Sequence, residues 1–529
     1  MSFHAFNHVM SMSASQNLES ILESPNTSFP TRTKSICPEC LEEGKVKVID
    51  AFFKVRIGER GEQVYMEKEC EEHGVFEERI GKKELLERWY RWKIDGERKV
   101  TITQSNYGCP QDCGLCPNHK SQTVLGIIDV TNRCNLNCRI CFDLPEKVGY
   151  LYEPSLKEIK RAMLSLRESG AKALQLTGGE PTVLENLEEY VRLAKQIGFE
   201  HVEVNTNGLR IAEEGPSYVK KLKDAGVSTY YLSFEGLTEG PYREKVGENP
   251  PPGKVLKLKK RFVEVCREAG HNSIVLVPTL VGGSNDKEAW GIVKYALENS
   301  DVIRCVNFQP VSIVGRIEKS ERKRMRITTS DLVELLEEQS KGIVSKYDFY
   351  PGSFLAPLSD VVSMIKGKKY FKFSYHPWCG VATFLIKDEG GWKPITRLGN
   401  VERLMEEFSE AYRKYEAERG YLRKKFRKLK SIFDVWRSMK RNLEERLYRE
   451  VMSVVRRGDY RSTGDFMRKI VMVGDMHFMD PYNFDLERVQ RCVIHYGLPD
   501  GKIIPFCTMN TIHREKIVKK FSTPLKKRT

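Results

Sequence analysis

The sequence predicts an α/β protein built around a partial (β/α)6 barrel of the TIM-like kind, with small cysteine-containing modules on either side. Three observations carry this prediction. Strand-like and helix-like segments alternate from Thr123 to about residue 320. Two short Cys/His knuckles precede that region, and three further cysteines in loop-like text follow it. The barrel is therefore expected to carry the chemistry, since active sites of such barrels lie at the carboxyl ends of the strands.

Length and composition exclude several classes of protein. The chain has 529 residues, of which 40% are hydrophobic, and its mean hydropathy is −0.47. These values exclude collagen-like, wholly disordered and polytopic membrane proteins. The longest apolar run, Ile274–Leu280, is too short to span a bilayer. Because the start resembles no secretory signal, the 14 cysteines indicate metal or redox chemistry in a reducing cytoplasm.

Six segments are expected along the chain. The first is Ser/Asn-rich and flexible, and the fifth is mainly helical. The expected segments are 1–35 (flexible), 36–80 (metal module), 81–120 (helix and cysteine loop), 121–320 (barrel), 321–470 (helices) and 471–529 (late cysteines and a basic tail).

The barrel segment contains six β/α units. The expected strands are Thr123–Val130, Ala173–Leu176, His201–Thr206, Thr229–Phe234, Ser273–Leu280 and Val302–Ile313. The expected helices are Ser155–Ser169, Leu187–Ile197, Ser217–Gly226, Lys254–Gly270 and Trp290–Leu297, and one further helix is expected over residues 82–95.

The first cysteine group predicts a mononuclear metal site. Cys37-x2-Cys40 and Cys70-x2-His73 bring four sulfur and nitrogen ligands together from two knuckles. Such a set suits tetrahedral zinc, as in a zinc ribbon, or a single iron, as in rubredoxin. The alternative is a redox pair made by the first two cysteines, but it leaves the second knuckle without a role.

Two later groups share the spacing Cys-x3-Cys-x2-Cys, namely Cys109, Cys113 and Cys116, and Cys134, Cys138 and Cys141. Three thiolates can hold a 4Fe–4S cluster and leave one iron open. An open iron can bind the amino and carboxylate groups of S-adenosyl-L-methionine (SAM), whose reduction releases a 5′-deoxyadenosyl radical.

Context assigns catalysis to the Cys134 triplet. Its loop directly follows the first barrel strand, and LTGGEP, with Gly178, Gly179 and Glu180, ends the next strand. Glycines admit a ligand close to the backbone, and Glu180 can accept hydrogen bonds from a cationic amino group. The Cys109 triplet lies before the barrel and is expected to hold an auxiliary cluster.

The last cysteines predict a second auxiliary cluster. Cys379, Cys492 and Cys507 lie beside Gly, Pro and His in non-periodic text. The fourth ligand is open, with His376, His477 and His495 as candidates. Cys266 and Cys305 are expected to be core residues.

NRCNLNCRIC and LTGGEP, on six β/α units, resemble the radical SAM superfamily. One departure is Ile140, where most members have an aromatic residue. The resemblance suggests further SAM-binding positions, each of which could equally be an ordinary strand-end hydrogen-bonding group. These positions are Asn205, Asn207, Ser233, Glu235 and Gln309.

The complete layout also resembles the archaeal tetraether lipid synthases. That resemblance implies coupling of terminal methyl carbons of phytanyl chains on archaeal ether phospholipids. It implies three 4Fe–4S clusters, one mononuclear iron or zinc, and a low-potential electron donor such as ferredoxin. It also implies a cytoplasmic enzyme bound peripherally to the inner face of the membrane.

The net charge of +15 is concentrated in two places. Residues 411–470 carry 19 Lys/Arg against 8 Asp/Glu, and the tail from Thr511 is also basic. The apolar spacing predicts one amphipathic helix over Phe426–Val455. Such a helix could pack on the protein or lie on an anionic membrane, and both interpretations remain open. Nucleic acid is not expected, because no aromatic side chains interleave with the charge on a strand or loop.

Two alternatives to lipid coupling follow from the same residues. One is a radical SAM methylase that acts on a reduced pterin, which requires a small polar pocket with a carboxylate for the ring. Lipid coupling instead requires a wide apolar tunnel. The other alternative is a non-enzymatic iron–sulfur scaffold or RNA-binding protein, against which the intact GGEP motif argues.

Overall fold

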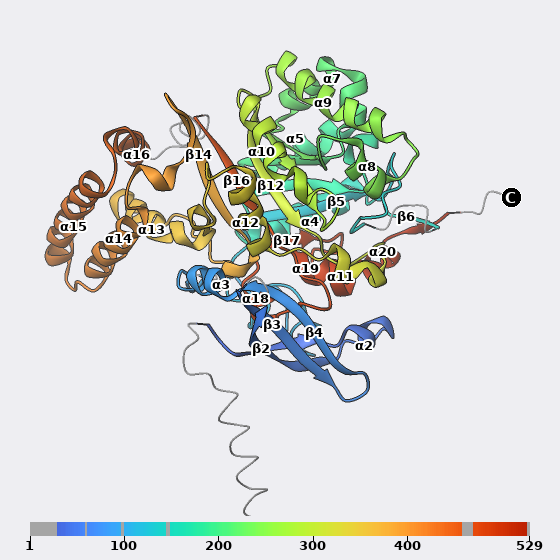
Figure 1. Cartoon of the computed structure of the whole chain (residues 1–529), viewed down its shortest axis with the longest axis horizontal. Helices are drawn as coiled ribbons and strands as arrows, with labels where there is room; N and C mark the ends of the chain where they lie inside the picture. Colours follow the sequence, from blue (N-terminus) through green and yellow to red (C-terminus); the bar gives the residue numbers. More distant parts are fainter. Residues whose placement is uncertain (1–28, 59–60, 97–99, 144–148, 458–468, 526–529) are drawn as a thin grey trace, which may run out of the picture.

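A computed structural model describes residues 29–58, 61–96, 100–143, 149–457 and 469–525. The flexible segment expected over residues 1–35 lies outside the described residues as far as residue 28. The described chain forms a small sheet at the bottom of Figure 1, a large barrel-like domain above it and a helical lobe to one side.

The small sheet is a four-stranded antiparallel meander. Its strands are β1 (Arg32–Ile36), β2 (Val48–Gly58), β3 (Gly61–Cys70) and β4 (Gly74–Lys82), in sequence order. The short helix α2 (Pro38–Glu42) follows β1, and α3 (Lys83–Tyr90) follows β4. Helix α3 is shorter than expected, since the chain leaves the helical conformation after Arg91.

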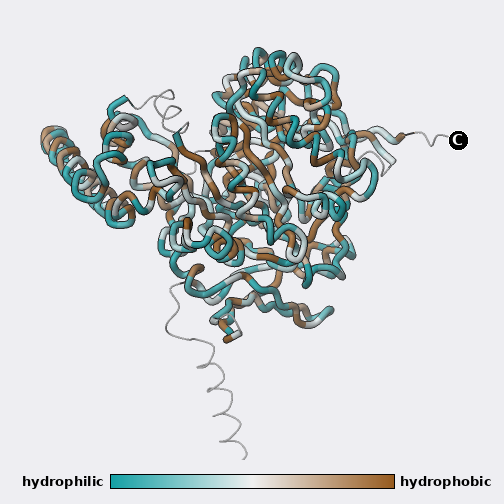
Figure 2. Tube along the Cα trace, turned by 45° about the horizontal axis from the view of Figure 1, so that its top comes forward, coloured by the Kyte–Doolittle hydropathy of each residue, from teal (hydrophilic) through white to brown (hydrophobic). Residues whose placement is uncertain are grey.

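The barrel forms from the six predicted strands, which pair in parallel. They are β5 (Leu125–Thr131), β7 (Ala173–Gly178), β8 (His201–Thr206), β9 (Thr229–Ser233), β10 (Ile274–Val277) and β12 (Ile303–Pro310), with β11 (Thr279–Leu280) beside β12. The covering helices are α4 (Leu156–Glu168), α5 (Leu187–Ile197), α6 (Leu209–Glu214), α7 (Pro216–Ala225), α8 (Glu239–Val246), α9 (Pro252–Glu268) and α10 (Ala289–Glu298). Hydrophobic residues concentrate inside this domain (Figure 2).

The carboxyl-terminal region extends the barrel at both edges. Strand β16 (Ile470–Asp475) pairs in parallel with β12, and β17 (Ile494–Gly497) pairs in parallel with β5. The described sheet therefore has eight adjacent parallel strands. The sequence analysis expects the alternation of strands and helices to end near residue 320. It misses β16 and β17, because the strands with which they pair, β12 and β5, are distant in the sequence.

The region between the barrel and β16 is not purely helical. Strands β13 (Tyr350–Pro351), β14 (Val381–Asp388) and β15 (Gly391–Pro394) add an antiparallel edge next to β16. The helices are α11 (Arg322–Met325), α12 (Thr329–Gln339), α13 (Ala356–Lys366), α14 (Val401–Glu416), α15 (Tyr421–Asn442) and α16 (Glu445–Arg457). Helices α14 to α16 form the lobe at the left of Figure 1.

The single helix predicted over Phe426–Val455 is wrong. It breaks at Leu443, whose backbone is extended and forms a bridge with Gly399. The backbone N–H of Asn400 also donates to the carbonyl of Asn442. Pairing with residues 399–400 thus draws the chain out of the helix, and α16 starts anew.

The predicted apolar stripe divides before that break, between Trp436 and Met439 within α15. Met439, Leu443 and Leu447 are buried against the lobe, whereas Phe426 and Leu429 are exposed. Within the described part of the chain, no helix has the length and apolar character that a membrane span requires.

The final segment wraps from the barrel to the small sheet. It contains α18 (Leu486–Gln490), β18 (Ile503–Pro505), α19 (Phe506–Thr508) and α20 (Arg514–Lys520), and β19 (Thr523–Pro524) pairs with β6 (Tyr150–Leu151).

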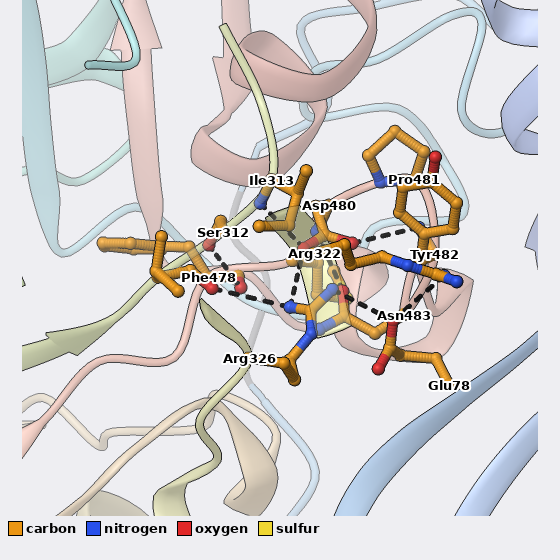
Figure 3. A network of polar contacts seen from close by, with 12 residues as sticks. Glu78, Ser312, Ile313, Arg322, Arg326, Phe478, Asp480, Pro481, Tyr482 and Asn483 are labelled. Atoms are coloured by element: carbon orange, nitrogen blue, oxygen red, sulfur yellow. Dashed lines mark hydrogen bonds and ion pairs between the residues drawn. The ribbon is translucent and has the colours of Figure 1, made fainter. Parts of the chain in front are cut away.

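A buried polar network joins the small sheet to this segment (Figure 3). Arg326 lies between Asp480 and Glu78, with nitrogen–oxygen distances of 2.7 and 3.2 Å. The backbone N–H of Ile313 donates to Asp480 at 2.9 Å, and Arg322 also contacts Glu78. One arginine thus connects the small sheet, the end of the barrel and the carboxyl-terminal loop.

Candidate functional site

The four residues of the first Cys/His group converge as predicted. Cys40 Sγ lies 3.8 Å from Cys70 Sγ and 3.4 Å from His73 Nδ1, and Cys37 Sγ lies 3.5 Å from the same nitrogen. Although burial opposes ionisation, hydrogen bonds from the backbone of Glu72 and from His73 lower the pKa of Cys70 to about 6. A low pKa favours the thiolate that binds metal. The set therefore fits one tetrahedral ion.

Glu43 supports this group and was missed in the sequence. Its Oε1 lies 3.2 Å from His73 Nε2, the ring nitrogen opposite the one that faces the sulfurs. A carboxylate in this place fixes the tautomer and orientation of a ligating histidine. A glutamate shortly after a CPEC knuckle gives no distinctive sequence signal, because surface glutamates are common.

Substituting Glu43→Gln is expected to weaken zinc affinity by about 10- to 100-fold, since the histidine loses its anionic partner. Competition with a chelator, on protein whose iron–sulfur clusters have been reconstituted, measures this affinity. Glu39→Gln is the matched control, because Glu39 is exposed on α2. Equal zinc affinity in both variants would show that Glu43 does not support the ligand.

The barrel encloses a cavity of about 500 Å³. It runs from Leu125 and Thr229, at the amino-terminal halves of their strands, to the loops beyond the carboxyl ends. Cys134, Cys138 and Cys141 lie on its wall. Burial raises the pKa of Cys141 to about 12, and the neighbouring Cys138 acts in the same direction.

The predicted GGE motif packs on the loop that carries these cysteines. The N–H of Gly179 donates to Thr131 O, and the N–H of Glu180 donates to Arg133 O, both at 2.8 Å. A Cβ at Gly178, which has φ +128°, or at Gly179 would collide with carbonyls of that loop. The glycines are therefore needed for contact between two loops, rather than only for contact with a ligand.

Glu180 is held rigidly beside the Cys134 loop. It accepts hydrogen bonds from the N–H groups of Thr182 and Asn207, at 3.1 and 2.6 Å, and from the Thr206 hydroxyl at 2.6 Å. The side chain is buried and lines the cavity. A carboxylate oriented in this way can still accept from a cationic amino group.

The other predicted SAM-binding residues also line the cavity; they are Asn205, Asn207, Ser233, Glu235 and Gln309. Two lysines that also line the cavity, Lys245 and Lys259, were not predicted from the sequence. Lys245 pairs with Glu235, and Lys259 donates to Asn207 O and Ser233 Oγ at 2.6 and 2.9 Å. Burial lowers the pKa of Lys259 to about 8. A signal existed, because Lys259 lies on the apolar stripe of α9 with Val255 and Phe262.

A buried arginine closes another side of the cavity. Arg514 Nη1 lies 2.9 Å from both Asp129 and Asp143, and its guanidinium lies over the ring of Tyr496. Asp129 could have been noticed in the sequence as a charge within an otherwise apolar strand. Arg514 could not, because its partners are more than 370 residues away.

The remaining cysteines gather outside the barrel. Cys109, Cys113, Cys492 and Cys507 share one buried cluster. Cys379 Sγ accepts a hydrogen bond from Arg488 at 3.4 Å, and Arg488 also interacts with Cys507. Burial, and then Cys379 nearby, raise the pKa of Cys492 to about 11. The structure thus brings Cys379, Cys492 and Cys507 together and places them beside Cys109 and Cys113.

Cys116, the third cysteine of the predicted auxiliary triplet, differs from the other two. Its side chain is buried, but Cys116 does not belong to the apolar cluster of the described residues that Cys109 and Cys113 join. Cys116 nevertheless lies near its predicted partners. Burial, and then the charge of Cys116, raise the pKa of Cys109 to about 12. The role of Cys116 as a ligand of the auxiliary cluster stays a prediction.

The three candidate histidines differ in their surroundings. His376 Nδ1 accepts from Trp378 N at 3.2 Å. Within the described residues, His477 Nε2 and both ring nitrogens of His495 are buried without a hydrogen-bond partner.

The spacing of the cysteines separates two kinds of site. Among the described residues, the Cys37 group and a neighbouring acidic set are the ones whose donor atoms all lie within 4.8 Å. The three other cysteine triplets are spaced more widely. A cubane cluster holds its thiolates farther apart than a single ion does, so this wider spacing leaves the predicted clusters open.

Cys266 and Cys305 are both buried, as expected of core residues. Cys266 packs in the main core, whereas Cys305 also lines the cavity.

Comparisons with known proteins identify two regions. Residues 29–81 match the HMPTM N-terminal zinc ribbon domain, and residues 128–296 match the radical SAM superfamily. These matches confirm the expected α/β class, the barrel and the amino-terminal ribbon.

Individual relatives cover different shares of the chain. A 7,8-dihydro-6-hydroxymethylpterin dimethyltransferase of Methanocaldococcus jannaschii is 42% identical over 502 residues, covering 93% of this chain and 96% of that protein. A GTP 3′,8-cyclase of Peptoclostridium acidaminophilum is 29% identical over 241 residues, covering 43% and 69%. The crystal structure of Streptococcus suis SuiB is 21% identical, with a TM-score of 0.34, and covers 43% and 48%.

Proposed function

Because this chain belongs to the radical SAM superfamily, in the same family as the Methanocaldococcus jannaschii pterin dimethyltransferase, we propose that it is a radical SAM methyltransferase acting on a reduced pterin. The observation that carries the proposal is the near-complete coverage of that relative at 42% identity. The carboxylates on the cavity wall, Glu180, Glu203 and Glu235 among them, support it.

The expected tetraether lipid synthase activity is wrong, and so are its ether phospholipid substrates, its membrane partner and ferredoxin as an inferred donor. The near-full-length relative carries a pterin name instead. The cavity agrees, since about 500 Å³ lies within the range of roughly 300–1,000 Å³ for small-molecule sites.

Cys134, Cys138 and Cys141 are the residues proposed to hold the radical-generating 4Fe–4S cluster. When bound, this cluster supplies the electron that converts SAM into methionine and a 5′-deoxyadenosyl radical. Their position at the carboxyl ends of the strands, on the cavity wall, supports this assignment.

The SAM-binding role proposed for the surrounding residues rests on their donors and acceptors. Glu180 is oriented to accept from the methionine amino group. Lys259 has three N–H donors, two of which are used by Asn207 and Ser233, so the third is available to a ligand carboxylate. Asn205, Glu235 and Gln309 present amide and carboxylate groups to the rest of the cavity.

Further metal sites complete the proposal. We assign one auxiliary cluster to Cys109, Cys113 and Cys116, a second to Cys379, Cys492 and Cys507, and one mononuclear ion to Cys37, Cys40, Cys70 and His73. His477 or His495 is a candidate fourth ligand of the second auxiliary cluster, because both rings are buried with unused nitrogens. The six segments expected from the sequence remain the proposed division of the chain.

A direct assay tests the function. Reconstituted protein is incubated anaerobically with dithionite, SAM and 7,8-dihydro-6-hydroxymethylpterin, and the pterin is analysed by mass spectrometry. We expect pterin species heavier by one and two methyl groups, with formation of 5′-deoxyadenosine from the SAM that supplies the radical and of S-adenosylhomocysteine from the SAM that donates the methyl groups. Cleavage of SAM with the pterin unchanged and unbound would contradict the proposed substrate.

A further inference from the structure

Several polar side chains line the interior of the barrel below the SAM-binding residues. Side chains that point into the cavity from three adjacent strands there are Gln175 on β7, Glu203 on β8 and Tyr231 on β9. Asn307, on β12, donates to the Tyr231 hydroxyl. These groups pair with one another, but their remaining donor and acceptor positions can serve a ligand with hydrogen-bonding groups.

Glu203 differs from the other acidic residues of the described cavity lining. Asp129 and Asp143 are paired with Arg514, Glu235 is paired with Lys245, and Glu180 is held by backbone and hydroxyl donors. The partners of Glu203 are the Gln175 amide at 3.0 Å and His201 Nε2 at 3.3 Å. A carboxylate has about four acceptor positions, so Glu203 can accept further N–H groups.

Glu203 lies deep in the barrel, below the Cys134 loop, where it can contact the end of a substrate that is farthest from SAM. It lies four residues before Asn207 on the same strand and loop, and strands rise roughly 3.3 Å per residue. Glu203 is therefore on the order of 10 Å below the level of Glu180 and the Cys134 loop, to which Asn207 is bonded. A planar bicyclic ring anchored at Glu203 would extend towards the residues that bind SAM.

We infer that Glu203 recognises the 2-amino-4-oxopyrimidine edge of the substrate, by accepting hydrogen bonds from its ring N–H and its exocyclic amino group. This inference rests on the proposed pterin methyltransferase function. Two adjacent donors of this kind match the two oxygens of one carboxylate, and charge-assisted pairs of this geometry are strong and specific. Gln175 holds the carboxylate in place through its amide.

Reduced pterins and guanine nucleotides share this edge, but the cavity favours the pterin. Each described Lys or Arg on the lining already has acceptors within the protein: Lys245, Lys259, Arg304 and Arg514. A triphosphate would need several free cations. An uncharged bicyclic ring needs none.

Binding of defined ligands to Glu203→Gln tests the inference. The probes are 7,8-dihydro-6-hydroxymethylpterin, its 2-oxo (lumazine) counterpart and GTP, each titrated anaerobically into the full-length protein. The amide of Gln presents N–H groups to the ligand's own donors, so we expect pterin binding to weaken by roughly 10- to 100-fold. Lumazine binding should strengthen instead, because the 2-oxo group of lumazine faces the Glu203 carboxylate unfavourably and can accept a hydrogen bond from the amide of Gln.

Two further variants separate recognition from folding. Glu200→Gln is the matched control, since Glu200 is exposed and pairs with Lys172 at 3.0 Å outside the cavity. It should bind all three ligands as the wild type does. Glu203→Asp keeps a carboxylate and should keep the preference for pterin over lumazine.

The outcomes distinguish the inference from the proposed function. Unchanged pterin binding by Glu203→Gln, or an equal loss of pterin and lumazine binding, would overturn the role of Glu203. Wild-type protein that binds no pterin would overturn the proposed function. If it binds GTP instead, and Glu203→Gln weakens that binding, Glu203 recognises the shared edge and the pterin assignment fails.

Discussion

Cys138→Ala protein is expected to produce no 5′-deoxyadenosine above background when it is incubated anaerobically with SAM and dithionite. The cluster at the cavity wall needs all three thiolates of its triplet, and an alanine removes one of them. Iron content should fall by about four atoms per chain. Chromatographic detection of 5′-deoxyadenosine and iron analysis of the reconstituted protein measure the two effects.

Two other cysteine variants provide the controls. Cys266→Ala removes a thiol buried in the main core on α9, away from the cavity lining, and should retain both iron and SAM cleavage. Cys113→Ala should lose iron and still cleave SAM, because Cys113 lies outside the barrel. If Cys138→Ala still cleaves SAM while Cys113→Ala does not, the assignment of the two triplets must be exchanged.

Local patterns in the sequence were sufficient to predict the six barrel strands and five of the helices that cover them, but not the short helices α6 and α8. Helix α4, for example, begins at a capping box made by Ser155 and Glu158, both of which lie within the predicted helix. Strands β16 and β17 could not be placed from such patterns. Each is short, and each becomes a barrel strand only through pairing with β12 or β5, more than 160 residues away.

The candidate site was predicted unevenly for the same reason. Motif spacing identified Cys134, Cys138, Cys141 and Glu180, because these residues lie in two short segments. Glu203 and Arg514 were missed, because their importance depends on what faces them across the barrel. Charge and periodicity also suggested a membrane helix, but the same pattern arises in a helix that packs one half of its stripe and breaks at Leu443.

Arg326→Met is expected to destabilise the protein by about 3–5 kcal/mol, the usual cost of removing one member of a buried ion pair. The Arg326 and Asp480 side chains are only 4% and 0% exposed, so Asp480 would keep a buried charge without its cation. Thermal unfolding followed by tryptophan fluorescence measures the loss. Limited proteolysis reports release of the small sheet, to which Arg326 is linked through Glu78 (Figure 3).

The control and the pH dependence make this prediction specific. Arg322→Met removes the other cation beside Glu78, but Glu78 keeps Arg326 and Asp480 keeps its own cation, so the expected loss is smaller than that of Arg326→Met. Burial by itself would raise the pKa of Asp480, and Arg326 instead holds it below its usual value. In the wild type, the stabilisation from this pair persists until the pH falls through that lowered pKa. In Arg326→Met, burial dominates and the pKa rises, so protonation relieves the buried charge. The difference in free energy of unfolding between the wild type and Arg326→Met should therefore shrink towards acidic pH. Adding Asp480→Asn to the Arg326→Met protein should restore part of the lost stability at neutral pH. If the difference in free energy of unfolding does not vary with pH, Arg326 stabilises the contact between the small sheet and the carboxyl-terminal segment by packing alone.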